Sequence, residues 1–136
     1  RKRTRLLLSI SDQLPTLQAD RDKLRQVLLN LLSNAIKFTR DEGEVDVAAE
    51  PAKNEGGDLR VLLSVSDNGI GIPTDLHDKV FDAFYQVDNS STRQHEGSGL
   101  GLLLVRRYIA AHGGKVWIED RPQGGTIFRI LLPVSG

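Results

Sequence analysis

The stretch "LRQVLLNLLSNAIKFT", residues 24–39, carries the periodicity of an amphipathic helix and organises the rest of the fold. Its apolar residues recur at i, i+3, i+4, i+7, i+8, i+11 and i+12: Leu24, Val27, Leu28, Leu31, Leu32, Ala35 and Ile36. Because a helix has roughly 3.6 residues per turn, these positions form one apolar face. Asp20 is a suitable N-cap, and we expect the helix to run to about Thr39.

Three polar side chains lie beside this apolar face. Asn30, Asn34 and Lys37 fall within about 60° of one another, just outside one edge of the apolar stripe. Each asparagine lowers helix stability by roughly 0.5 kcal/mol relative to alanine. They are either boundary residues that make local hydrogen bonds or parts of a binding site. The helix alone leaves both interpretations open.

The remaining segments predict a sheet and a second helix. Five segments read as strands: "RLLLSI" as a short buried strand, "GEVDVAAE" with "DLRVLLSVS" as a hairpin, and "KVWIED" with "TIFRILLPV" joined by "RPQGG". "TDLHDKVFDAF" predicts one or two short helices, and "LGLLLVRRYIAAH" predicts a helix that stops at Gly113 and Gly114. Two long helices and about five strands indicate an α/β sandwich.

Composition excludes several classes of protein. The 136 residues fit one domain with one core, and 18 basic and 18 acidic side chains cancel, which argues against a nucleic-acid partner. The absence of cysteine excludes disulfides, thiolate metal sites and a cysteine nucleophile. No apolar run approaches the roughly 20 residues of a membrane span. The chain begins with arginine and lacks methionine, so we expect a fragment of a longer protein, with residues 1–5 as a linker remnant.

"VSDNGIGIP" places Asp67 at the end of a predicted strand, followed by Gly69 and Gly71. Glycines allow a ligand to approach the backbone closely. A carboxylate at this position can accept a hydrogen bond from the amino group of adenine, whereas guanine presents an oxygen there. The alternative is that Asp67 only opens a turn, as Asp-Asn-Gly often does.

"EGSGLGLLL" places Gly97, Gly99 and Gly101 at the entrance to the second helix. Exposed N–H groups and the positive end of the helix dipole favour a polyphosphate at such an entrance. A dinucleotide-binding fingerprint would need a glycine where Leu102 stands, and the chain has no Gly-Lys-Ser/Thr of a Walker A loop. Both standard phosphate-binding motifs are therefore excluded.

In chain order, these segments resemble the motifs of the catalytic, ATP-binding domain of sensor histidine kinases, in the GHKL superfamily with gyrase, heat-shock chaperone and mismatch-repair ATPases. The matching segments are "DKLRQVLLNLLSNAIKFT", "DNGIGIP", "VFDAFYQVD", "GSGLGLLLVRRYIAAHGG" and "GGTIF". The resemblance covers residues 4–133. It implies an α+β fold: a two-layer sandwich with a mixed, mostly antiparallel sheet, helices on one face and a mobile ATP lid over residues 86–98.

The resemblance also assigns roles, with ATP and Mg²⁺ as cofactors. Asn34 would bind the metal, Asn30 would assist around the metal and phosphates, and Lys37 would face a phosphate. Asp67 would bind the adenine amino group. The other expected nucleotide contacts are Gly69, Gly71, Ile72, Arg93, Gly97, Ser98, Gly99, Leu100, Gly101, Leu102 and Thr126. We expect Phe81 and Phe84 to pack in the core instead.

The implied function is transfer of the ATP γ-phosphate to a histidine on a separate dimerisation domain, for relay to the receiver domain of a response regulator. The alternatives are an ATPase of the same superfamily and a nucleotide-binding scaffold. The ATPases use a glutamate where Asn30 stands, and an amide cannot accept a proton from water. We expect a monomeric fragment of a homodimeric parent, in the cytoplasm; membrane anchoring of the parent stays open.

Overall fold

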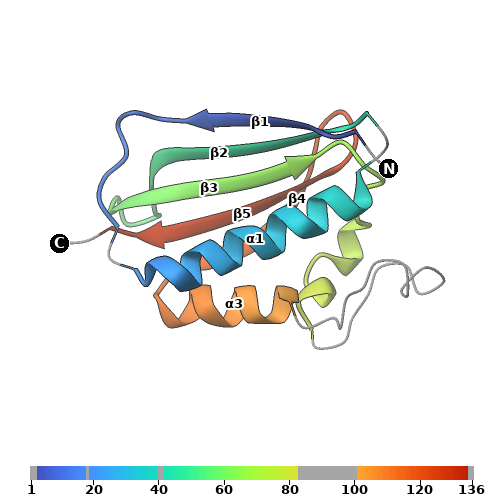
Figure 1. Cartoon of the computed structure of the whole chain (residues 1–136). Helices are drawn as coiled ribbons and strands as arrows, with labels where there is room; N and C mark the ends of the chain where they lie inside the picture. The colour runs from blue at the N-terminus through green and yellow to red at the C-terminus, as the bar shows by residue number, and fades with distance from the viewer. Residues whose placement is uncertain (1–2, 18, 40–41, 83–100, 135–136) are drawn as a thin grey trace.

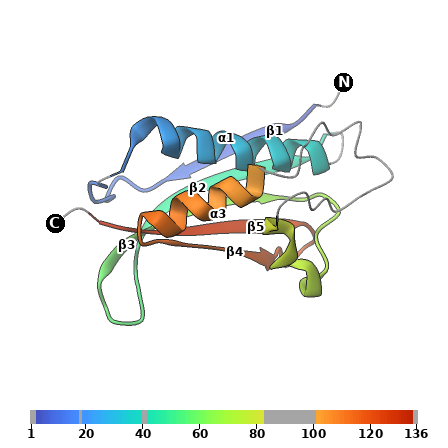
Figure 2. The same cartoon turned by 90° about the horizontal axis from the view of Figure 1, so that it is seen from below.

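The computed structural model describes residues 3–17, 19–39, 42–82 and 101–134, which form a sheet with helices packed on one face (Figures 1 and 2). The elements are β1 (Arg5–Ile10), α1 (Arg21–Phe38), β2 (Glu44–Lys53), β3 (Leu59–Asp67), η1 (Thr74–Leu76), η2 (Lys79–Phe81), α3 (Gly101–Ala111), β4 (Lys115–Asp120) and β5 (Thr126–Pro133). The expected α+β, two-layer fold is confirmed.

The five strands lie in the order β1-β2-β3-β5-β4. β1 pairs with β2 in parallel, and the other three pairs are antiparallel. A parallel pair needs a crossover connection, and α1 lies in the connection between β1 and β2. The β2–β3 and β4–β5 pairs are the two predicted hairpins, so the mixed, mostly antiparallel sheet is confirmed.

Local hydrogen bonds determine where α1 begins and ends. Oδ1 of Asp20 accepts hydrogen bonds from the backbone N–H groups of Asp22 and Lys23, at 3.0 and 3.2 Å. These bonds satisfy donors that have no partner within the helix, so the predicted N-cap is confirmed. At the other end, Thr39 is extended (φ −80°, ψ 158°), and its N–H still donates to the carbonyl of Ala35.

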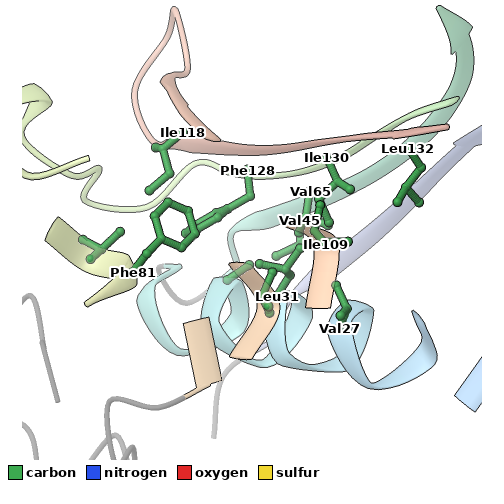
Figure 3. Close-up of a cluster of buried hydrophobic side chains, with 13 residues drawn as sticks. Val27, Leu31, Val45, Val65, Phe81, Ile109, Ile118, Phe128, Ile130 and Leu132 are labelled. Atoms are coloured by element: carbon green, nitrogen blue, oxygen red, sulfur yellow. The ribbon is translucent and has the colours of Figure 1, made fainter. Parts of the chain in front are cut away.

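The core lies between the sheet and the two long helices (Figure 3). Leu31 of α1 and Val105 of α3 are fully buried. They meet residues on the inner face of the sheet: Val45, Val65, Phe128 and Ile130. Burying one side chain of this size stabilises the fold by roughly 1.5–3 kcal/mol. The apolar stripe of α1 is therefore the surface that joins the two layers.

Phe81 belongs to this core and packs edge-on against Phe128, with ring centroids 6.2 Å apart. Its expected core role is confirmed, whereas Phe84 lies outside the described residues. The segment around Phe81 forms the short 3-10 helices η1 and η2, which agrees with the prediction of one or two short helices.

The expectation of a buried strand near the start of the chain is wrong. All six residues of β1 are exposed, and Leu8 is 66% exposed. β1 lies at the edge of the sheet with β2 as its neighbour, and none of its residues belongs to the core. The strand also begins at Arg5, a residue that the expected linker remnant over residues 1–5 included.

Within the residues that the structure describes, neither long helix has the length and hydrophobicity that crossing a membrane requires.

Candidate functional site

The site is built around the carboxylate of Asp67, the last residue of β3. The strand register places Asp67 between Val45 of β2 and Thr126 of β5. The residue is 5% exposed, and its Oδ1 accepts a hydrogen bond from the N–H of Gly69 at 2.8 Å. Among the described residues, Oδ2 has no hydrogen-bond partner. One oxygen is thus held in place while the other can accept a bond from a ligand.

Burial also changes the acidity of this group. Desolvation raises the pKa of Asp67 above its ordinary value of 3.8. The hydrogen bond from Gly69 and the positive charge of Arg121 act in the opposite direction. Burial has removed water from this carboxylate. A ligand that donates a hydrogen bond to it would replace that water and stabilise the ionised form.

Two glycines bring the loop after Asp67 against the start of β5. Gly71 has a φ of +78°, and a Cβ placed on it would lie 3.5 Å from the carbonyl oxygen of Gly125. A Cβ on Gly125, whose φ is +112°, would lie 1.9 Å from the carbonyl oxygen of Asp67. Only glycine fits this position, and the close approach holds Thr126, 4% exposed, beside Asp67.

The far end of the same loop is also held. Ile72 is partly buried against the core. Its carbonyl oxygen lies 3.0 Å from Nε2 of His77, and the same nitrogen lies 3.3 Å from Oδ1 of Asp120. A carbonyl can only accept, so Nε2 carries the proton and donates.

The polar flank of α1 faces the start of α3. Oδ1 of Asn30 accepts a hydrogen bond from Nε2 of Gln26 at 3.0 Å, and its Nδ2 donates to the carbonyl of Gly101 at 3.4 Å. Asn34 is partly buried, and within the described part of the chain its side chain has no hydrogen-bond partner. Lys37 is partly buried in the last turn of the helix.

Asn68 connects the end of α1 with the Asp67 loop. Its Oδ1 accepts hydrogen bonds from Oγ1 of Thr39 at 3.0 Å and from the N–H of Glu44 at 2.9 Å. From Asn30 to Thr39 the helix rises roughly 13 Å. The flank of α1 therefore runs from the start of α3 to the loop that follows Asp67.

The structure thus gathers Asp67, Gly69, Gly71, Ile72 and Thr126 at one end of the inner strands β3 and β5 and brings Asn30 against Gly101. Leu102, in the first turn of α3, packs against the core. Arg93, Gly97, Ser98, Gly99 and Leu100, like the expected lid over residues 86–98, lie outside the described residues. The individual roles of all these residues stay predictions.

Three residues at the site did not stand out in the sequence. The signal for Gly125 was present in "GGTIF", where a glycine precedes a strand. Asn68 looked like part of a turn, and His77 had no motif around it. Their partners Thr39 and Asp120 lie 29 and 43 positions away, so no local pattern could indicate these contacts.

A metal ion could find only part of its ligands in the described residues. These contain no group of three or more His, Cys, Asp or Glu side chains that could hold a metal. Asn34 and Asn30 offer amide oxygens, which suit Mg²⁺, although the oxygen of Asn30 already accepts from Gln26. Mg²⁺ prefers about six oxygen ligands. The two asparagines therefore fit an ion that also binds phosphate oxygens and water.

Comparison with known proteins agrees with this geometry. Residues 19–136 match the model of the family described as histidine kinase-, DNA gyrase B- and HSP90-like ATPase. The adaptive-response sensory kinase SasA of Trichormus variabilis is 39% identical over 125 residues, which cover 92% of this chain and 30% of that protein. The chain therefore spans less than a third of the length of that relative.

Solved structures give the same result. The catalytic domain of histidine kinase ThkA in a nucleotide-free form matches with a TM-score of 0.79 and 30% identity, over 98% of this chain and 82% of that one. Full-length ShkA in complex with AMPPNP matches with a TM-score of 0.77 and 38% identity, over 96% of this chain and 25% of that one. The chain belongs to the histidine kinase-, DNA gyrase B- and HSP90-like ATPase family, as a catalytic ATP-binding domain of the sensor histidine kinase type.

Proposed function

We propose that this domain binds ATP together with Mg²⁺ and transfers the γ-phosphate to a histidine on a separate dimerisation domain. The phosphoryl group then passes to the receiver domain of a response regulator. The observation that supports this most directly is the Asp67 carboxylate: buried, held through Oδ1 by Gly69, and, among the described residues, without a partner at Oδ2.

Asp67 would select the base. Oδ2 accepts a hydrogen bond from the exocyclic amino group of adenine, while the loop from Gly69 to Ile72 lies beside the base. Guanine would put an oxygen against the carboxylate, leaving a buried acceptor unpaired and repelled. The relative ShkA, solved with AMPPNP, supports a nucleotide with an adenine base.

The polar flank of α1 would take the phosphates. Asn34, with Asn30, would hold Mg²⁺ jointly with the phosphate oxygens, and the ion would neutralise part of their charge. Lys37 would add a positive charge on the same flank. Gly101, at the start of α3 and in contact with Asn30, would bring the N–H groups at that helix end toward the phosphates.

The geometry favours phosphoryl transfer to a protein over hydrolysis. The side chain of Asn30 is an amide with both ends hydrogen-bonded, to Gln26 and to Gly101, so it has no site to accept a proton from water. In transfer, the bond from the γ-phosphorus to the bridging oxygen breaks, a bond to an imidazole nitrogen forms, and ADP leaves. Positioning and charge neutralisation are sufficient for this reaction.

The direct test combines this domain with a cognate dimerisation domain and ATP labelled at the γ-phosphate, with Mg²⁺ present. We expect label on a histidine, and its loss in Asp67→Asn and Asn34→Ala. Asp75→Asn and Ser33→Ala, exposed neighbours of the two sites, are the matched controls and should retain transfer. Release of free phosphate without labelled histidine would instead support an ATPase.

We also infer that this domain is a monomer within a homodimeric parent, because the proposed phosphoacceptor histidine lies on a separate domain that makes the dimer contacts. A site that uses ATP and passes phosphate to a response regulator belongs in the cytoplasm, whatever anchors the parent. Light scattering on the isolated domain tests the first point: a dimer at micromolar concentration would contradict it.

A further inference from the structure

His77 lies outside every expected motif, yet it connects two parts of the site. Nε2 lies 3.0 Å from the carbonyl oxygen of Ile72 and 3.3 Å from Oδ1 of Asp120. Oδ2 of Asp120 accepts a hydrogen bond from Oγ1 of Thr74 at 3.1 Å. The His77 side chain is 15% exposed, so these bonds are shielded from much of the competing water.

The strand register shows what Asp120 is attached to. Asp120, at the end of β4, pairs with Thr126 of β5, and Thr126 pairs with Asp67 of β3. These three residues form one row across the sheet. Through Asp120, His77 is therefore anchored to the same row that carries the base-selecting carboxylate.

The loop that begins at Asp67 is consequently held at three points. Near its start, the N–H of Gly69 donates to Asp67. In its middle, Gly71 passes close to the backbone of Gly125. At its end, the carbonyl of Ile72 accepts from His77. Of these three contacts, that of His77 involves a side chain from beyond the loop, as does the bond from Thr39 to Asn68 at the start of the loop.

We propose that His77 is a positioning residue for adenine recognition: by fixing the Ile72 carbonyl, it holds the base-binding loop in its binding conformation before nucleotide arrives. The proposal rests on the proposed binding of ATP at Asp67. A loop that is already ordered loses less conformational entropy on binding, which strengthens affinity without a direct contact to the ligand.

The surroundings of His77 separate this role from a general contribution to folding. The adjoining helix η1 contains no buried residue, and the side chain of Asp120 is 61% exposed. Neither His77 nor Asp120 belongs to the hydrophobic core, so losing the hydrogen bonds between them and Ile72 removes no contact within that core. The effect should therefore appear in nucleotide affinity and base selectivity more than in the stability of the whole domain.

Two substitutions isolate the hydrogen bond. His77→Leu keeps an apolar side chain of similar size and removes the donor. His77→Gln places an amide N–H near the position of Nε2 and restores a donor to Ile72. His112→Leu is the matched control: His112, at the end of α3, interacts through Nδ1 with the carbonyl of Tyr108 and does not contact the loop.

The experiment is calorimetric titration of the domain with ATP and, by displacement, with GTP, together with thermal unfolding of each variant. We expect His77→Leu to weaken ATP binding on the order of tenfold and to narrow the preference for ATP over GTP. His77→Gln should stay within about threefold of the parent, and His112→Leu should bind normally.

Each outcome decides between explanations. The positioning role is overturned if His77→Leu binds ATP as tightly as the parent. It is also overturned if this variant binds ATP and GTP more weakly by the same factor and unfolds at a lower temperature. Neither result would contradict ATP binding at Asp67. Failure of the parent chain itself to bind ATP would overturn the proposed function and this inference together.

Discussion

Oγ1 of Thr39 donates a hydrogen bond to Oδ1 of Asn68 at 3.0 Å, and this contact joins the end of α1 to the loop that follows Asp67. The first of these residues ends the helix that carries Asn30 and Asn34. The second follows the carboxylate at the other end of the site. This hydrogen bond is therefore one of the contacts that fix the relative position of the two ends of the proposed nucleotide site, beside the packing of α1 on the sheet.

Removing that hydrogen bond should weaken the fold and the site together. Thr39→Val keeps the shape of the side chain and deletes the donor at a position that is 3% exposed. We expect a loss of about 1 kcal/mol in the free energy of unfolding and weaker ATP binding. Urea denaturation measures the first and calorimetry the second. The exposed Thr16→Val is the control, and an equal effect there would show that the Thr39 bond has no special importance.

The raised pKa of Asp67 predicts a pH dependence of nucleotide binding. As the pH falls through this raised pKa, the carboxylate takes up a proton and Oδ2 loses acceptor strength. As the pH is lowered, ATP affinity should therefore begin to fall at a higher pH than it would if the binding aspartate were exposed and had an ordinary pKa. Titrations of ATP at a series of pH values on the parent, with the exposed-site variant Asp75→Asn as a control that should follow the parent, measure this; an ATP affinity that does not change as the pH falls would contradict it.

The raised pKa of Asp67 also makes the stability of the folded domain depend on pH. The folded-state pKa of Asp67 lies above its ordinary value of 3.8, so the native state binds the proton more tightly than the unfolded chain. Burying the ionised group therefore lowers stability above the raised pKa, and this penalty disappears as the pH falls through it. On acidification the parent should therefore become more stable relative to Asp67→Asn, as measured by the free energy of unfolding. Chemical denaturation at neutral and acidic pH tests this, and a constant difference would refute it.

Gly125 and its neighbour Gly124 offer a matched pair of substitutions. Both have positive φ angles, +112° and +106°, but a Cβ on Gly125 would overlap the Asp67 carbonyl, whereas nothing lies within 4 Å of a Cβ on Gly124. Gly124→Ala should cost about 1–2 kcal/mol of unfolding free energy from backbone strain alone. Gly125→Ala should cost at least about 3 kcal/mol and abolish ATP binding, because the backbone must move. Similar losses in both variants would mean that the close approach to Asp67 is unimportant.

Local signals in the sequence were sufficient for most of the fold. The periodicity around Leu31 predicts α1, and the N-cap at Asp20 predicts where it begins, because both depend on residues a few positions apart. The burial of β1 was not predictable in this way. An apolar strand looks the same at the edge of a sheet as in its centre, and the difference depends on strand order, which arises from pairing between distant segments.

The same distinction applies to the site. Asp67, Asn30 and Asn34 stand out because their chemistry is unusual for their local positions, an acid at a strand end and amides beside an apolar helix face. His77 shows no such anomaly. Its importance depends on Asp120, 43 positions later, which reaches it only because β4 pairs with β5 in the observed register.

In the proposed function, one site holds the adenine at Asp67 and the metal-bound phosphates at Asn34. Calorimetric titration with ATP, with and without Mg²⁺, of the parent, Asp67→Ala and Asn34→Ala measures both ends of that site in one experiment. We predict that the parent binds ATP more tightly with Mg²⁺, that Asp67→Ala loses binding under both conditions, and that Asn34→Ala loses only the gain from Mg²⁺. Unchanged ATP binding in Asp67→Ala, or an undiminished effect of Mg²⁺ in Asn34→Ala, would mean that these two residues do not form one nucleotide site.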